Sequence, residues 1–240
     1  MSHTLLMRLV APMQSWGVQS DFTHRDTGLE PSKSGVIGLL CAALGKPRYE
    51  NHPDNQDKPP LAQLAQLRMG VRVDREGLLK RDYHTAGKGG YLKASGDIEK
   101  KDLIVSERYY LADAAFLVGL EDGNLELLQQ LDIALHHPHW SLFLGRKAFV
   151  PSERVWLENG VHKNQTLEES LMNHHRLRRA RRFDDKRMRL VIEAKAGEPA
   201  EITRRDQPLS FVKGQRAFDF RYLRTDFCDD CPLLEDKETA

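Results

Sequence analysis

Apolar residues recur along the first 150 positions with two different spacings, and these spacings predict an ordered series of strands and helices. Strands are expected where apolar or alternating runs of strand length occur, at 4–10, 68–75, 107–120 and 140–144. Helices are expected where the apolar spacing is helical, at 31–45 and 124–136. The order strand, helix, strand, strand, helix, strand is that of a ferredoxin-like antiparallel sandwich with both helices on one face. The pattern therefore predicts an α+β fold.

A long segment with few apolar residues, 76–106, interrupts this series between the second and third strands. Gly, Lys and Asp are frequent in it, and thirty residues without a core signal inside a compact domain usually serve a function. We expect a protruding β-hairpin there. After residue 150 the pattern is less regular, with a helix beginning near Thr166 and short strands at 187–194, 201–205 and 217–224. We therefore expect two parts, 1–150 carrying the insert and a β-rich extension over 151–240.

The helix expected at 31–45 has an unusual beginning. Ser32 or Ser34 can cap it, and Lys33 lies between the two serines. A helix start with free N–H groups, hydroxyls and a cation suits an anion such as a phosphate. A capped core helix with a solvated lysine fits the same residues, so the pattern leaves both interpretations open.

The net charge of +1 over 240 residues gives no overall sign of a nucleic-acid partner, but the charge is unevenly spread. Residues 176–189 contain eight Lys or Arg and two Asp, whereas residues 226–240 contain six acidic residues and one Lys. Such a basic run contacts nucleic acid or a partner, or forms a solvated helix face. The pattern does not choose between these uses.

The cysteine count and the lack of long apolar runs indicate a cytoplasmic protein with no membrane association. Three cysteines provide no disulfide framework. No apolar run approaches the roughly 20 residues that cross a bilayer, and the first residues lack the apolar region of a signal peptide.

Two groups of residues have the composition of an RNA-binding site. The turn Gly145-Arg146-Lys147 follows an expected strand, and its adjacent cations suit a phosphate chain. The insert interleaves cations with Tyr83, His84 and Tyr91, a composition suited to single-stranded RNA. If the turns at one end of the sheet meet, His24, Arg25, Lys33, Arg146 and Lys147 converge on one anionic path.

No catalytic or metal motif accompanies these candidates. Cys228 and Cys231 have the spacing of a zinc ligand pair, but no second pair matches it. HxxxH, HExxH, GxSxG and phosphate-loop motifs are missing, so we expect no metal and no cofactor. A metal-independent ribonuclease that uses His24 or His84 with Tyr83 and Lys33 stays open as an alternative.

Six stretches, in this order along the chain, resemble the CasD family of CRISPR-associated proteins in the RAMP superfamily. They are Ala11–Gly17 (APMQSWG) followed by Arg25, Pro31–Leu40 (PSKSGVIGLL), Arg81–Thr85 (RDYHT), Tyr110–Val118, Leu144–Lys147 (LGRK) and Arg205–Pro208 (RDQP). The resemblance runs from residue 4 to about residue 225 and is most specific in the first two stretches.

This resemblance implies an RRM-like domain with a hairpin thumb over about 84–106, in a non-catalytic subunit of the type I-E Cascade antiviral complex. Such a subunit binds the 5′ handle of the crRNA, contacts the backbone and large subunits, and meets target DNA only through the complex. Relatives in subtype I-C cut repeat RNA without a metal, so the endoribonuclease alternative stays open. The RNA-binding residues expected from the motifs and the resemblance are Gln14, Trp16, His24, Arg25, Ser32, Lys33, Ser34, Gly35, Arg81, Tyr83, His84, Lys88, Arg108, Arg146 and Lys147.

Overall fold

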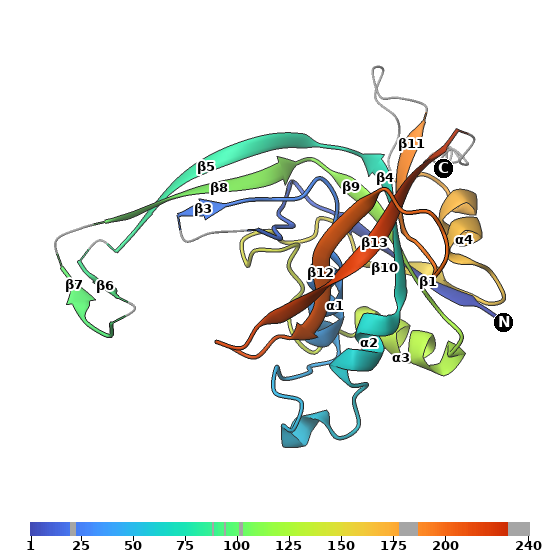
Figure 1. The fold of residues 1–240 in the computed structure, drawn as a ribbon, viewed down its shortest axis with the longest axis horizontal. Coiled ribbons are helices and arrows are strands. Elements are labelled where there is room, and N and C mark those ends of the chain that lie inside the picture. Colours follow the sequence, from blue (N-terminus) through green and yellow to red (C-terminus); the bar gives the residue numbers. More distant parts are fainter. Residues whose placement is uncertain (20–22, 88, 94, 101–102, 178–186, 230–240) are drawn as a thin grey trace, which may run out of the picture.

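The computed structural model describes the chain except residues 20–22, 88, 94, 101–102, 178–186 and 230–240. Its centre is an antiparallel sheet of seven strands in the order β10-β1-β9-β4-β11-β13-β12 (Figure 1). These strands are β1 (His3–Val10), β4 (Arg68–Arg75), β9 (Ala115–Asp122), β10 (Trp156–His162), β11 (Met188–Glu193), β12 (Ile202–Ser210) and β13 (Ala217–Cys228). The helices are α1 (Lys33–Ala43), α2 (Leu61–Gln66), α3 (Leu125–His136) and α4 (Leu167–Asn173), with a short 3-10 turn, η1, at Pro53–Asn55.

Strand β1 shows how the sheet separates two hydrophobic cores. Side chains on a strand alternate between faces, and Leu5, Met7 and Leu9 belong to the larger core with residues of α1 and α3. Leu6 points to the other face, where it joins a smaller core that includes Leu167 and the rest of the buried side of α4. Helices α1 and α3 therefore cover one face of the sheet, and α4 covers part of the other. Among the described residues, no helix combines the length and apolar character that a membrane span requires.

The antiparallel α+β architecture and most of the expected elements agree with the structure. The strand expected at 107–120 is wrong as a single strand, because the chain turns at Asp113, whose φ is 58°. The strand expected at 140–144 is also wrong. Its backbone instead binds the end of α1 and a nearby loop, since Trp140 donates to the Ala42 carbonyl and Leu144 to the Phe149 carbonyl. Strand β10 takes the place beside β1.

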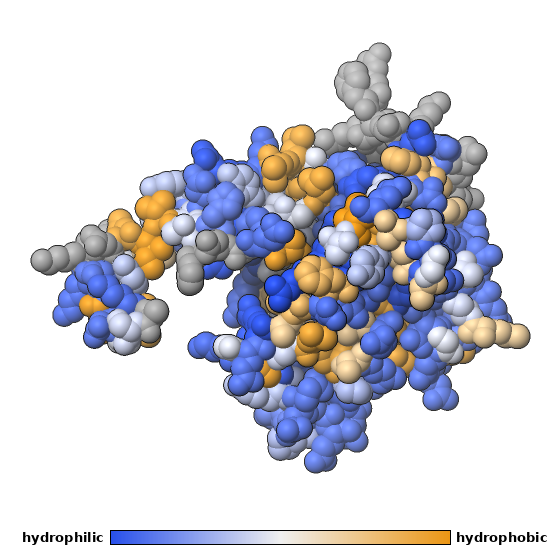
Figure 2. Space-filling view, viewed as in Figure 1, coloured by the Kyte–Doolittle hydropathy of each residue, from blue (hydrophilic) through white to orange (hydrophobic). Residues whose placement is uncertain are grey.

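The insert forms a long two-stranded arm, defined here as residues 78–112, that projects from the sheet (Figure 1). Strands β5 (Leu78–Ala86) and β8 (Ile104–Ala112) pair along their whole length. The short strands β6 (Tyr91–Leu92) and β7 (Ile98–Glu99) pair at the far end. Hydrophobic side chains are exposed along the arm (Figure 2), among them Leu79, Leu92, Ile98 and Leu103.

Two short strands attach the arm to the rest of the chain. Strand β2 (Met13–Gln14) pairs with β8 in the antiparallel sense, and β3 (His24–Arg25) pairs with β8 in the parallel sense. The base of the arm therefore meets the loop that precedes α1.

The last third of the chain continues the same sheet. Strand β11 pairs with β4, and β13 and β12 follow it outward. Because β10 and β11 lie beyond residue 150 and pair with β1 and β4, one sheet runs through both expected parts. The boundary at residue 150 stays a prediction.

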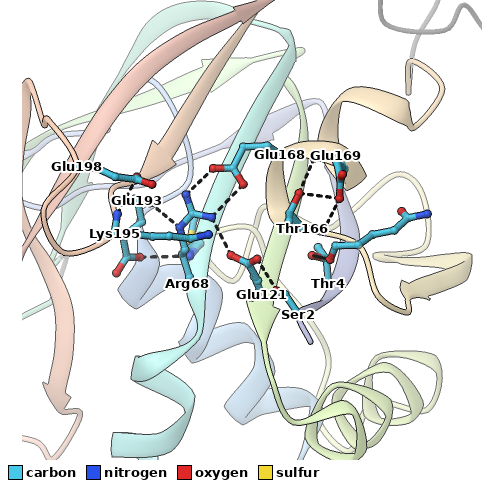
Figure 3. A network of polar contacts seen from close by, with 12 residues as sticks. Ser2, Thr4, Arg68, Glu121, Thr166, Glu168, Glu169, Glu193, Lys195 and Glu198 are labelled. Atoms are coloured by element: carbon cyan, nitrogen blue, oxygen red, sulfur yellow. Dashed lines mark hydrogen bonds and ion pairs between the residues drawn. The ribbon is translucent and has the colours of Figure 1, made fainter.

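Arg68 joins five elements through a network of charged groups (Figure 3). Its guanidinium donates to Glu121 of β9 at 2.7 Å, to Glu168 of α4 at 2.5 Å, and to the Glu193 carbonyl of β11 at 2.8 Å. Arg224 of β13 donates to the same Glu168 at 2.8 Å. Burial by itself raises the pKa of Glu168, but the hydrogen bonds from Arg68 and Arg224 outweigh it and lower that pKa to about 2.

Candidate nucleic-acid interface

A groove of about 590 Å³ lies beside α1, where segments from the whole length of the chain meet. Its walls come from the loop after β2, from β3 and β8, from residues 46–50, from residues 140–146 and from the β12–β13 hairpin. Six cationic residues and two acidic residues line it: Arg25, Lys46, Arg48, Arg108, Arg146, Arg216, Asp26 and Glu50. This excess of positive charge suits a polyanion.

Three arginines crowd one wall of the groove. Arg25 of β3 and Arg108 of β8 are neighbours in the parallel pairing of these strands. Arg146 reaches the same region and donates to the Tyr109 carbonyl at 2.9 Å. Burial lowers the pKa of Arg146, and the like charges of Arg108 and Arg25 lower it further. An anion bound here would relieve this repulsion.

Small residues of α1 form another side of the groove. Ser34, Gly35, Gly38 and Ala42 line it, and a Cβ added at Gly35 would lie 3.0 Å from the Trp16 ring. Glycine at position 35 therefore permits the helix and the indole to pack closely. Seven of the residues expected in an RNA site do line one groove: Trp16, Arg25, Ser32, Ser34, Gly35, Arg108 and Arg146.

Lys33 is not on this surface, which corrects the expectation that it meets a phosphate. Its side chain is 0% exposed, and its ammonium donates to both carboxylate oxygens of Glu193 at 2.9 and 3.0 Å. Burial lowers the pKa of Lys33, while Glu193 opposes that shift. The lysine is therefore an internal ion-pair partner.

The anion expected at the start of α1 is present, but it belongs to the protein itself. The Lys33 backbone N–H donates to Asp206 at 2.8 Å, and Arg221 donates to the same carboxylate at 2.5 and 2.9 Å. Ser32 caps the helix by accepting from the Gly35 N–H at 3.3 Å. The helix dipole is thus already compensated by an internal carboxylate.

The loop before α1 is fastened to the same part of the sheet. Glu30 is buried and accepts from Arg189 of β11 at 2.9 Å and from Arg204 of β12. The last third of the chain therefore sets the position of the helix that borders the groove.

Gln14 is a structural residue, which corrects its expected place on the RNA surface, and it holds the indole of Trp16. The Gln14 amide donates to the Leu9 carbonyl at 3.1 Å and to the Ala114 carbonyl at 2.9 Å. The Trp16 indole donates to the Gln14 side-chain oxygen at 3.2 Å. Both side chains are buried, although part of Trp16 lines the groove, and the contact of Trp16 with RNA stays a prediction.

Except for Arg108, the expected residues of the arm lie outside the groove lining, and so does His24 of β3. His24 has its Nδ1 at 3.9 Å from Glu107, and Arg81 pairs with the same carboxylate at 2.8 Å. Tyr83 is exposed and His84 is half-buried on β5. Lys147 is exposed but does not line the groove, and Lys88 lies outside the described residues.

Several groove residues were not predicted from the sequence. Arg48 follows α1 in a polar loop, Arg216 lies in the turn between β12 and β13, and Trp140 is 46% exposed at the rim. The loop composition around Arg48 and Arg216 resembles that of any solvated loop. Trp140 did stand out in the sequence as an apolar residue, but it was interpreted as part of the strand expected at 140–144.

The remaining candidates give no metal site in the described part of the chain. Within it, no three His, Cys, Asp or Glu residues come together as metal ligands. Cys228 is disulfide-bonded, which the cysteine count did not predict and which removes its thiol as a ligand. Cys231 lies outside the described residues, as do residues 178–186 of the basic run.

The comparisons with known proteins agree with one another. The family model described as CRISPR-associated protein (Cas_Cas5) matches residues 4–224. The chain is 30% identical over 183 residues to the CRISPR system Cascade subunit CasD of Escherichia coli (strain K12), covering 71% of this chain and 76% of that protein. A solved structure described as a crystal structure of a Cas protein is 38% identical with a TM-score of 0.69, covering 95% of both chains. Another, described as a CRISPR RNA-guided surveillance complex, is 32% identical with a TM-score of 0.72, covering 94% of this chain and 90% of that chain.

Proposed function

The chain belongs to the CRISPR-associated protein (Cas_Cas5) family, and from this premise we propose that it is a non-catalytic crRNA-binding subunit of a type I-E Cascade antiviral complex. In this role it holds the 5′ handle of the guide RNA. The observation that carries the proposal is the groove beside α1, where six cationic residues from five separate segments line one space. The similarity to CasD supports the assignment to Cascade.

The groove suits the backbone of an RNA strand better than a nucleotide cofactor. Arg25, Arg108 and Arg146 offer guanidinium groups that bind phosphate oxygens in pairs. Trp140 offers an exposed ring at the rim on which an unpaired base can stack. Phosphate contacts position a strand, whereas base contacts choose its sequence, so we assign the arginines to affinity and Trp140 to base contact.

The finer fold assignment is also a proposal. Strands β10-β1-β9-β4 are neighbours in that order, and α1 and α3 connect β1 to β4 and β9 to β10. This is the arrangement of a ferredoxin-like, RRM-like unit, with the arm as its thumb. Strands β11, β13 and β12 then form the C-terminal extension.

The arm is the part of the chain that we assign to contacts with other Cascade subunits. Its exposed Leu92 and Ile98 lie at the tip on paired short strands, and exposed hydrophobic residues that cluster mark protein-binding surfaces. We propose contact with the neighbouring backbone subunit there and contact with the large subunit elsewhere. Target DNA is reached through the assembled complex.

Co-purification tests the proposal. The tagged chain is expressed with the other Cascade subunits and a repeat-spacer RNA, and the bound RNA is sequenced. The expected result is a crRNA whose 5′ handle is protected from nuclease by the chain. Replacing Arg25, Arg108 and Arg146 together by alanine should remove this protection, while the remote exposed Lys163→Ala should keep it. Protection that survives the triple replacement contradicts the assignment of the groove.

A further inference from the structure

Strand β13 carries a row of three aromatic side chains, defined here as Phe218, Phe220 and Tyr222. They occupy every second position, so they lie on one face of the strand, about 7 Å apart. Phe220 is 55% exposed and Tyr222 is 59% exposed. Arg221 and Leu223, between and beyond them, are buried against the opposite side.

An anchored arginine borders this aromatic row. Arg205 of β12 is the cross-strand neighbour of Phe220, and its guanidinium lies 5.8 Å from the centroid of that ring. Its Nε donates to the Phe218 carbonyl at 3.1 Å. The strand pair therefore presents rings and a guanidinium plane side by side, the two side-chain types on which unpaired bases stack.

The aromatic row begins at the groove. Phe218 lines the groove together with Phe211 and Arg216 of the same hairpin, and the rings of Phe211 and Phe218 are 6.5 Å apart. Strands β12 and β13 cross the front of the molecule in Figure 1, and Figure 2 shows hydrophobic and hydrophilic side chains mixed over them. The row therefore has one end at the cationic groove. Phe220 and Tyr222 continue along β13 on the sheet face opposite to Arg221, whose carboxylate partner Asp206 binds the start of α1.

We propose that Phe218, Phe220 and Tyr222, with Arg205, form a stacking track for unpaired bases of an RNA strand whose adjoining phosphates lie in the groove. This inference rests on the proposed function and extends the RNA path from α1 onto the C-terminal hairpin. Single-stranded RNA fits better than a protein partner for two reasons. An anchored guanidinium, that of Arg205, lies beside the central ring, and the first ring of the row lines a groove of positive charge.

Fluorescence anisotropy with labelled oligouridines tests the track on the purified full chain. One RNA of roughly four nucleotides occupies the groove, and one of roughly twelve extends past it. Phe220→Ala combined with Tyr222→Ala should weaken binding of the longer RNA by about tenfold or more, and leave the shorter RNA unchanged. Phe220→Trp combined with Tyr222→Phe should restore the binding, because both replacements keep an aromatic face.

Two further variants separate the track from the groove and from loss of folding. Phe227→Ala removes an exposed ring of the same strand that strand alternation places on the opposite face, and it should bind both RNAs normally. Arg146→Ala should weaken binding of both RNAs. Both Phe220 and Tyr222 are exposed, so the double variant should keep the wild-type melting temperature.

The remaining outcomes overturn the inference in distinguishable ways. If the double alanine variant binds both RNAs normally while Arg146→Ala does not, the track is wrong and the groove assignment stands. If the double variant binds RNA normally but no longer co-purifies with other Cascade subunits, the face docks a protein instead. If Arg146→Ala also binds both RNAs normally, the proposed function itself fails.

Discussion

The backbone N–H of Lys33 donates to the Asp206 carboxylate at 2.8 Å, although 173 residues separate the two in the chain. Asp206 lies on β12 and also accepts from Arg221 of β13. The contact gives the first turn of α1 its anion from within the protein. It also ties the helix that borders the groove to the C-terminal strands. The position of the groove proposed to bind RNA therefore depends on contacts between α1 and the C-terminal strands.

Replacing Asp206 by alanine should therefore destabilise the protein by about 3–5 kcal/mol, because it leaves Arg221 buried without its carboxylate partner. Urea unfolding of the variant measures the loss. Asp57→Ala, which removes an exposed carboxylate from a loop, is the control and should change stability by less than about 0.5 kcal/mol. Similar unfolding midpoints for the two variants would show that Asp206 is not a structural anion.

Binding of handle RNA should depend on salt through the groove arginines. Arg25→Ala and Arg146→Ala should each weaken binding by roughly tenfold or more at low salt. Each replacement should also make the plot of log affinity against log salt shallower, by about 0.7 per lost phosphate contact. Filter binding over a salt series measures both effects, with Lys163→Ala as control. An unchanged slope in both arginine variants contradicts phosphate binding by these residues.

Acid should weaken the Arg68 network through Glu168. The folded pKa of Glu168, about 2, lies below the usual value for a glutamate, so its contribution is complete above the unfolded pKa and disappears as pH falls toward 2. The contribution is on the order of 1 kcal/mol after solvent screening. Urea midpoints between pH 6 and pH 2 should fall less steeply in Glu168→Gln than in the wild type. If the urea midpoints of both proteins fall equally with pH, Glu168 is not the source of the acid sensitivity.

The tip of the arm should matter for assembly rather than for folding. Leu92→Ser combined with Ile98→Ser should reduce co-purification with the other Cascade subunits, since both side chains are exposed and apolar. The melting temperature should stay unchanged, as is usual for surface replacements. Ile133→Ser, which changes an equally exposed residue on α3, should assemble normally. Normal assembly of the double variant would contradict the proposal that the tip contacts another Cascade subunit.

The chain should not cut RNA. Purified protein incubated with repeat RNA in EDTA should leave the RNA intact over hours, as measured on a denaturing gel. The half-buried His84 and the exposed His24, whose Nδ1 lies 3.9 Å from Glu107, are the candidate bases of the alternative. Cleavage at one position that His24→Ala or His84→Ala abolishes would overturn the non-catalytic assignment.

Some elements could be predicted because their signal is local. The apolar spacing of β1, β4, α1 and α3 depends only on neighbours within a few turns or residues, and each of these elements forms near its expected place. The strand prediction for 140–144 is wrong because the local signal is ambiguous there. A short apolar stretch fits a strand and a buried turn equally well. Its neighbours, α1 and the segment around Phe149, decided between the two.

The sequence by itself determined the antiparallel α+β pattern, the long insert and the family to which the chain is similar. It also placed Arg25, Arg108 and Arg146 among the candidates. Only the tertiary structure decided which cations face the solvent. Lys33 looked available, but its buried ammonium pairs with Glu193 and its backbone N–H donates to Asp206, both more than 150 residues away in the chain. Arg48 and Arg216 looked ordinary and line the groove. Ion pairing and burial depend on which distant segments meet, and no local pattern carries that information.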